Sequence, residues 1–265
     1  MLGVYGRLAA AGFRRQSQYR LAMIAGLITN VVFGFLRAAV LLTAVDAAGG
    51  ELGGYSRTQL ATYIWLSQGL LGAIGLWGVG VLSARIRTGD IAVDFTRPVD
   101  LQGWYLSEEL GRAGYALVLR GAPAIAVGLL TTGMVLPAAV GPWVLGAVSI
   151  VFAVTLNFCC TLVIDAVAFW VIETRGMFNL YVVVRSFLVG VFVPIHLLPG
   201  WLQSVAWSTP FPSVMQTPVD VLAGRTTGAA AVANVAVQAG WIVAVGVLGH
   251  LLMRAGRHRL EVQGG

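Results

Sequence analysis

The sequence predicts an all-α integral membrane protein with six transmembrane helices. Its 265 residues are 58% hydrophobic and only 11% charged, and the mean hydropathy is +0.83. A soluble domain carries about 25% charged residues, so this chain cannot cover a globule with polar surface. It is stable only where its outer face meets lipid. The length suits a single transmembrane domain that comprises residues 1–265.

Six apolar stretches approach the roughly 20 residues that a helix needs to cross a bilayer. They comprise approximately residues 21–42, 60–82, 116–135, 144–172, 180–198 and 229–253. Pro123 predicts a kink in the third stretch, because proline cannot donate a backbone hydrogen bond. The first stretch has the length of a full span and not that of a cleavable signal peptide.

The arginines predict the topology, since all 17 residues counted as Lys or Arg are arginine. If the N-terminus is cytoplasmic, the outer segments contain only Arg57 and Arg225. The inner segments then contain twelve, namely Arg7, Arg14, Arg15, Arg20, Arg85, Arg87, Arg97, Arg112, Arg175, Arg254, Arg257 and Arg259. This positive-inside bias places both termini in the cytoplasm. It accounts for the net charge of +6 without a nucleic-acid partner, so we expect a multi-pass protein of the inner or plasma membrane that contacts lipid.

Residues 1–20 are too polar to span a membrane. Leu2, Tyr5 and Leu8 recur near helical spacing, with arginines between and beside them. This pattern favours an amphipathic helix that lies in the cytoplasmic interface. A frayed terminus is the alternative.

The sequence contains no recognisable catalytic set. It has no GxxxxGK[ST], HExxH or GxSxG motif. The three histidines fall near predicted membrane edges, and Cys159 and Cys160 are adjacent, where a relaxed disulfide cannot form. We therefore expect no catalytic residue, no metal site and no bound cofactor in this chain.

Arg120, Asp165 and Arg185 form a candidate charge cluster within the membrane. Each is one to two turns from the predicted cytoplasmic end of its span, so the three lie at similar depths. One carboxylate between two guanidinium groups would offset part of the cost of burying them. A structural clamp is the favoured interpretation. Independent snorkelling of the arginines and a role in a translocation path are the alternatives.

Residues 84–112, between the second and third predicted spans, form the longest charged stretch. Its part RTGDIAVDFTRPVD mixes acidic and basic residues with Ile91, Val93 and Phe95. A solvated loop does not need these apolar residues. A short amphipathic segment that docks on a soluble partner does.

Residues 199–227, after the fifth predicted span, are only moderately apolar and cannot form a regular span. They contain four prolines together with Trp201 and Trp207. Tryptophan anchors membrane interfaces and proline breaks helices. Short helical pieces at or within the outer leaflet fit this composition, and a plain outer loop is the alternative.

In this order, the spans and segments resemble the permease subunits of ABC-2-type exporters. The closest likeness is to the branch in which two related but distinct permeases accompany one ATPase. The resemblance is carried by RTGDIAVDFTRPVD at 87–100, AFWVIETRG at 168–176 and SFLVGVFVPIHLLPGWLQSVAWSTPFPSVMQTPVDVLAG at 186–224. The last of these places Gly190, Pro194, Pro199, Pro210–Phe211, Pro218 and Gly224 in a fairly specific spacing.

The resemblance implies a role for each segment. Residues 84–112 would form a coupling helix on the ATPase, with Asp90, Asp94, Arg97 and Asp100 facing it. Residues 199–227 would form a re-entrant extracellular gate, with Pro194, Pro199, Trp201, Pro210 and Phe211 as its key residues. Two permeases, meeting through their first and fifth spans, and two ATPases would make the working unit. ATP and Mg²⁺ would bind in the separate ATPase, so this chain would not be catalytic alone.

Two other classes of function remain open at this point. A secondary transporter is compatible with six spans and buried charges, although the sequence shows no paired acidic relay and no inverted repeat. A lipid-modifying membrane enzyme is the third hypothesis.

Overall fold

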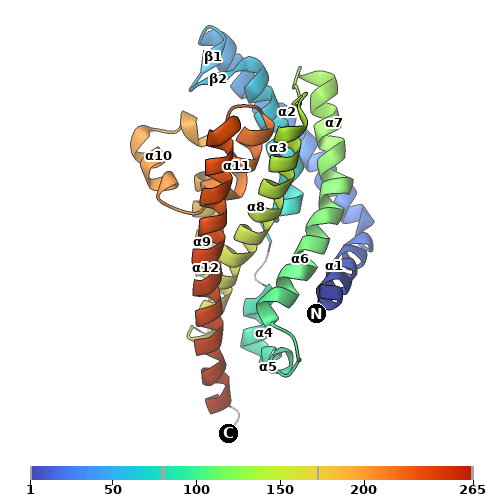
Figure 1. Cartoon of the computed structure of the whole chain (residues 1–265), viewed down its shortest axis with the longest axis vertical. Coiled ribbons are helices and arrows are strands. Elements are labelled where there is room, and N and C mark those ends of the chain that lie inside the picture. Colours follow the sequence, from blue (N-terminus) through green and yellow to red (C-terminus); the bar gives the residue numbers. More distant parts are fainter. Residues whose placement is uncertain (1, 79–80, 172, 264–265) are drawn as a thin grey trace.

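Long helices packed side by side form the body of the chain in the computed structural model, which describes residues 2–78, 81–171 and 173–263 (Figure 1). The α-helices are α1 (Leu2–Ser17), α2 (Arg20–Ala47), α3 (Arg57–Ile74), α4 (Val81–Thr88), α5 (Ile91–Phe95), α6 (Leu101–Ala116), α7 (Ala122–Thr131), α8 (Val140–Ala166), α9 (Arg175–Leu188), α10 (Gly200–Trp207), α11 (Pro212–Leu222) and α12 (Gly228–Gln263). A π-helical turn (Leu117–Gly121) and 3₁₀ turns (Val167–Phe169 and Ile195–Leu197) connect or extend them. Strands β1 (Glu51–Leu52) and β2 (Tyr55–Ser56) form an antiparallel hairpin.

Four helical segments among the described residues are long and apolar enough to cross a membrane. They are Arg20–Ala47, Leu101–Thr131, Val140–Phe169 and Gly228–Arg259. These segments coincide with the first, third, fourth and sixth predicted spans, so the chain is an integral membrane protein built from helices. Ile172, the predicted end of the fourth span, lies outside the described residues.

The second predicted span, residues 60–82, is wrong as a single helix. Helix α3 ends at Ile74, and Gly75 follows in the left-handed conformation with φ +71°. Glycine adopts this conformation without a side-chain clash and commonly terminates helices. Helix α3 is also enclosed by the bundle, because each of its residues from Leu60 to Ile74 is buried.

The fifth predicted span, residues 180–198, is also displaced. Helix α9 begins at Arg175, within the predicted turn, and ends at Leu188, ten residues before the predicted boundary. Gly190 follows with φ +82°, and the 3₁₀ turn Ile195–Leu197 comes next. A positive φ at Gly190 turns the chain sharply where hydrophobicity alone predicted a continuing helix.

The kink predicted at Pro123 takes the form of a π-helical turn just before this proline. The amide of Ala122 donates to the carbonyl of Leu117, five residues earlier, and α7 then starts with Pro123 in its first turn. Proline lacks the amide hydrogen and crowds the preceding turn, so a local widening relieves the helix. Helices α6 and α7 thereby form one long bent segment.

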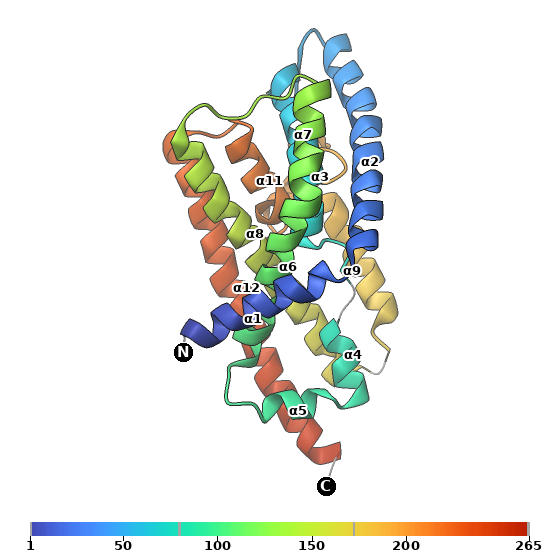
Figure 2. The ribbon, with the colours of Figure 1, turned by 90° about the vertical axis from the view of Figure 1, so that its right-hand side faces the viewer.

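Helix α1 crosses α6 at very close range (Figure 2). Gly12 lies against the backbone of Glu108, and Gly111 lies against the backbone of Ala9, so neither position has room for a Cβ atom. Phe13 and Tyr115 add an edge-to-face contact with ring centroids 5.1 Å apart. The helical part of the prediction for residues 1–20 is therefore confirmed, and α1 is tied to the bundle.

The two ends of the bundle differ in structure. The β-hairpin lies at one end, and α4, α5 and the C-terminal part of α12 lie at the other, which we call the α5 end (Figures 1 and 2). The hairpin connects α2 to α3. Its two-residue turn is Gly53–Gly54, both with positive φ, a combination that favours tight hairpins.

Candidate functional site

Residues 81–100 fold into a compact turn at the α5 end, which we call the α4–α5 segment. The carboxylate of Asp94 accepts hydrogen bonds from Arg85 Nε at 2.7 Å and Nη2 at 2.9 Å. Tyr105, on α6, donates a third at 2.8 Å. Asp94 thus fastens α5 to both α4 and α6, and it raises the pKa of the Arg85 guanidinium, chiefly through their hydrogen bonds.

This geometry corrects the prediction for Asp94. Its side chain is only 2% exposed, so it faces the interior and not a docking partner. Sequence spacing could not show this, because the apolar residues of α5 include Val93, which is 60% exposed. Ile91 is buried as an amphipathic pattern predicts, but Asp94 and Val93 have the reverse of the expected exposure.

Of the other predicted coupling residues, two are exposed and one caps a helix. Asp90 is exposed and accepts a hydrogen bond from Thr88. Arg97 stacks 4.0 Å over the ring of Trp104, with half of its side chain exposed. Asp100 caps α6 by accepting from the amide of Gly103 at 2.6 Å. Asp90 and Arg97 therefore remain available to a partner, together with Val93.

The predicted cluster of Arg120, Asp165 and Arg185 does not form. All three residues are described, and no arginine nitrogen lies within ion-pair distance of Asp165. Arg120 donates to Asn30 Oδ1 at 3.1 Å and to the carbonyl of Gly26. The prediction of a structural clamp is therefore wrong, and each of the three side chains binds other groups.

Arg185 lies at the C-terminal end of α3, where the chain leaves the helix. It donates to the carbonyl of Leu76 and, at 2.8 Å, to Asn157 Oδ1. Asn157 in turn donates to the carbonyl of Ile74 at 2.8 Å. The last carbonyls of a helix have no partner within it and carry partial negative charge, so cationic and amide donors stabilise them.

Arg112 completes this arrangement from α6. It donates to the carbonyls of Gly72 and Ala73, at 2.8 Å each, and forms an ion pair with Glu109. The terminal carbonyls of α3, a helix that stops inside the bundle, are thus bound by Arg112 and Asn157, and Arg185 binds the Leu76 carbonyl just beyond the helix. Arg112 and Asn157 were not predicted for this role, because nothing in the sequence marked Ile74 as a helix end except Gly75.

The side chain of Asp165, near the C-terminal end of α8, lies beside the first turn of α4. Its hydrogen-bonding neighbours are the Ser83 hydroxyl and the backbone amides of Leu82 and Ser83. Free amides at a helix N-terminus favour a carboxylate, which explains why Asp165 needs no arginine there. Its Oδ1 atom, however, is buried without a hydrogen-bond partner.

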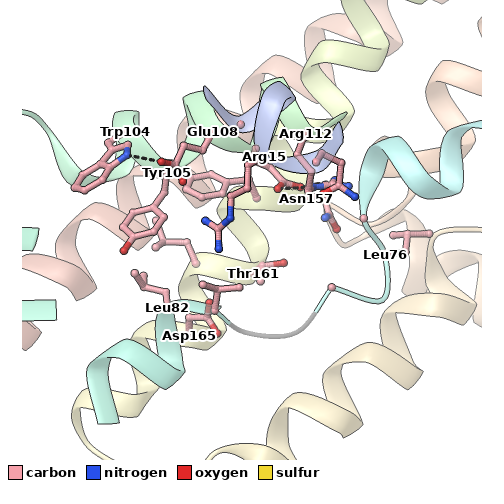
Figure 3. A pocket seen from close by; sticks show the side chains of 18 of the residues that line it. Arg15, Leu76, Leu82, Trp104, Tyr105, Glu108, Arg112, Asn157, Thr161 and Asp165 are labelled. Carbon is pink, nitrogen blue, oxygen red and sulfur yellow. Dashed lines mark hydrogen bonds and ion pairs between the residues drawn. The ribbon is translucent and has the colours of Figure 1, made fainter. Parts of the chain in front are cut away.

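A cavity of about 700 Å³ opens between these elements near the α5 end (Figure 3). Residues of α1, α4, α6 and α8 line it, and so does the C-terminal end of α3. Asp165 and Arg120 reach the cavity, whereas Arg185 does not. The wall combines aromatic and aliphatic side chains with charged groups, a composition typical of ligand pockets.

Residues 194–222 are broken into short helices, as the prolines predicted. Pro194 precedes the 3₁₀ turn, Pro199 precedes α10, and Pro210 precedes α11. Trp201 is 70% exposed, whereas Phe211 packs against the core beside Tyr181. These five predicted gate residues therefore lie along one irregular segment but do not share one environment.

A buried polar network anchors this segment to α3 and the hairpin. Tyr55 donates to Asp220 Oδ1 at 2.9 Å, and Gln216 donates to Asp220 Oδ2 at 2.8 Å. Tyr63 donates to Gln216 Oε1 at 2.8 Å, and the amide of Ile195 donates to the same oxygen. These residues were not predicted from the sequence. The four-residue spacing of Gln216 and Asp220, which sets them on one helix face, was the available signal.

Comparison with known families matches residues 29–264 to the family described as ABC-2 family transporter protein. No curated protein matches the chain. The matched residues include the α4–α5 segment, residues 194–222 and every cavity-lining residue except those of α1 and Tyr19. The chain therefore belongs to the ABC-2 family of transporter proteins, as an integral membrane component.

Proposed function

We propose that this chain is the permease subunit of an ATP-driven exporter and that a separate ATPase docks on the α4–α5 segment. The observation that carries this proposal is the outward surface of α5, where Val93 is 60% exposed beside Asp90 and Arg97. An exposed apolar residue flanked by opposite charges suits a protein partner. ATP and Mg²⁺ bind in that ATPase.

The contacts of the α4–α5 segment support a coupling role. Asp94 links α5 to α4 and α6, and Asp165 links the start of α4 to α8. Arg257, on α12, lies 5.5 Å from the ring centroid of Phe95. A displacement of α5 by the ATPase would therefore act on three long helices at once.

A second permease completes the transport path. Helices α2 and α9 lie along the same side of the bundle, to the right in Figure 2. Both helices have exposed large apolar side chains, including Phe33, Leu36 and Phe187. We expect this side to meet a related permease subunit more readily than an identical copy, with the substrate path between the two chains.

The remaining elements fit six crossings of a cell membrane. In this arrangement α3 and the shorter α9 are the second and fifth crossings, and both termini are cytoplasmic. The segment from Pro194 to α11 is the extracellular re-entrant gate, which the buried network around Gln216 holds in place. The α5 end then faces the cytoplasm and its ATPase.

Co-purification from native membranes tests the proposal, followed by ATPase and transport assays of the reconstituted complex. We expect an ATPase and a second permease to accompany the chain. Val93→Glu should release the ATPase, whereas Arg57→Glu, at the opposite end, should retain it. Transport by this chain alone, driven by an ion gradient, would replace the proposal with a secondary transporter. Chemical turnover of a lipid by the lone chain would favour the enzyme hypothesis.

A further inference from the structure

Charged side chains are unusually dense in the wall of the 700 Å³ cavity. They are Arg15, Arg85, Arg97, Arg112, Arg120, Asp94, Glu108, Glu109 and Asp165. Most of them satisfy one another or nearby polar groups. Asp94 pairs with Arg85 and Arg97, and Glu109 pairs with Arg112 at 2.6 Å.

Glu108 and Arg120 also have partners. Glu108 accepts a hydrogen bond from the indole of Trp104 at 2.9 Å. Arg120 donates to Asn30 and Gly26. Both Arg120 contacts use Nη2, and its Nε is buried without a partner. Two other charged groups also have unused capacity, and they face each other across the cavity.

The first is Asp165 on α8. Its side chain is 96% buried, since 4% is exposed, and Oδ1 has no hydrogen-bond partner. A buried carboxylate oxygen without a donor is costly, so a donor that enters the cavity would be bound strongly after a small rotation of the carboxylate.

The second group is Arg15 on α1. Among the described residues its guanidinium makes no hydrogen bond or ion pair. Figure 3 shows Arg15 reaching from α1 into the cavity, with Asp165 on the opposite wall beside α4. A cation and an anion therefore face the same space without pairing directly.

Neither a simple cation nor a simple anion fits this arrangement. A cation would meet five arginines, and an anion would leave Oδ1 of Asp165 without a donor. A zwitterion with a primary ammonium and a phosphate satisfies both, because the ammonium offers N–H donors and guanidinium binds phosphate well. A quaternary ammonium has no N–H and cannot serve Oδ1 of Asp165.

The rest of the wall favours an amphiphile. Leu71, Leu76 and Leu162 line the cavity together with the ring of Phe158. The cavity also adjoins α1, whose amphipathic sequence suits the level of lipid headgroups. Apolar chains could therefore contact these side chains while the headgroup contacts the charges.

We infer that the cavity binds a zwitterionic lipid whose ammonium contacts Asp165 and whose phosphate contacts Arg15. The site lies within one chain and is separate from the path expected between two permeases. It therefore does not depend on the ATPase or on the second permease.

Native mass spectrometry of the full chain in a neutral detergent tests this inference. The probes are short-chain phosphatidylethanolamine, phosphatidylcholine and phosphatidylglycerol, with phosphoethanolamine as the headgroup without chains. We expect phosphatidylethanolamine to bind about tenfold more tightly than the other two lipids, the effect of one charge-assisted hydrogen bond. Weaker binding of phosphoethanolamine supports a lipid ligand, and equal binding would overturn it in favour of a soluble zwitterion.

Two variants with matched controls locate the site. Asp165→Asn should abolish the preference for phosphatidylethanolamine over phosphatidylcholine, and Asp46→Asn should keep it. Arg15→Gln should weaken the binding of all three lipids about tenfold. Arg14 is exposed and outside the cavity wall, so Arg14→Gln should leave their binding unchanged. Arg15 is at the surface, so its variant remains informative if Asp165→Asn fails to fold. An unchanged lipid preference in Asp165→Asn, or unchanged affinity in Arg15→Gln, would overturn the inference.

Discussion

Asp94 accepts two hydrogen bonds from Arg85, at 2.7 Å and 2.9 Å, and thereby joins α5 to α4 across a sharp reversal of the chain. The carboxylate is almost fully buried, while a third of the arginine side chain is exposed. The pair therefore belongs to the interior of the α4–α5 segment. This relationship separates the residues that shape the segment from those that can contact a partner.

Replacing Asp94 should loosen the α4–α5 segment without unfolding the bundle. Asp94→Ala leaves Arg85 and Tyr105 without their shared acceptor, which should cost about 1–3 kcal/mol of local stability. Hydrogen exchange measured by mass spectrometry should show faster exchange in residues 81–100 only. Asp90→Ala, which removes an exposed carboxylate from the same segment, is the control. Equal protection in Asp94→Ala and the parent protein would refute the internal role of Asp94.

Arg185 should stabilise the protein by binding the chain just beyond α3 and by holding Asn157, which binds the last carbonyl of α3. Arg185→Gln removes the guanidinium that binds the Leu76 carbonyl and Asn157, so the free energy of unfolding should fall by about 1–3 kcal/mol. Thermal unfolding in detergent measures the effect. Arg175→Gln is a matched control on the same helix, because its side chain is exposed. If the two variants unfold at the same temperature, the capping role is wrong.

The crossing of α1 and α6 should not tolerate a side chain at its centre. Gly111→Val would force a Cβ atom onto the carbonyl of Ala9 and push α1 away from α6. Trypsin should then cleave faster at Arg14 and Arg15, which lie in α1. Gly114 lies three residues along the same helix, and a Cβ atom there would meet only the edge of Phe13 at 4.0 Å. Trypsin should therefore cleave Gly114→Val at the same rate as the parent protein. Resistance of Gly111→Val to trypsin would contradict the close crossing.

Cysteine accessibility should reveal the topology. In intact cells, a membrane-impermeant thiol reagent should label Arg57→Cys but label Arg257→Cys only after permeabilisation. Both native cysteines are buried, which keeps the background low. A reporter fused after Gly265 should likewise behave as cytoplasmic. The reverse labelling pattern would overturn the topology that the arginines predict.

Hydrophobicity was enough to predict the helices that face outward. Helices α2, α8 and α12, and the bent segment of α6 and α7, coincide with apolar stretches, because a lipid-facing helix must be apolar along its length. The bend before Pro123 and the short helices after Pro199 were also predictable, since proline acts through its own covalent structure. The family resemblance to ABC-2 permeases, which the match over residues 29–264 confirms, came from the order of these same elements.

The ends of α3 and α9 were not predictable from hydrophobicity, and the partners of the buried charges were not predictable from depth. Both depend on backbone groups that become available only in the folded chain. Once α3 stops at Ile74, its last carbonyls bind Arg112 and Asn157, and the first amides of α4 bind Asp165. The sequence by itself thus determined which segments are apolar, where the positive charge accumulates and where proline breaks the helices. Only the tertiary structure decided which groups satisfy one another, because that depends on distances between segments far apart in the chain.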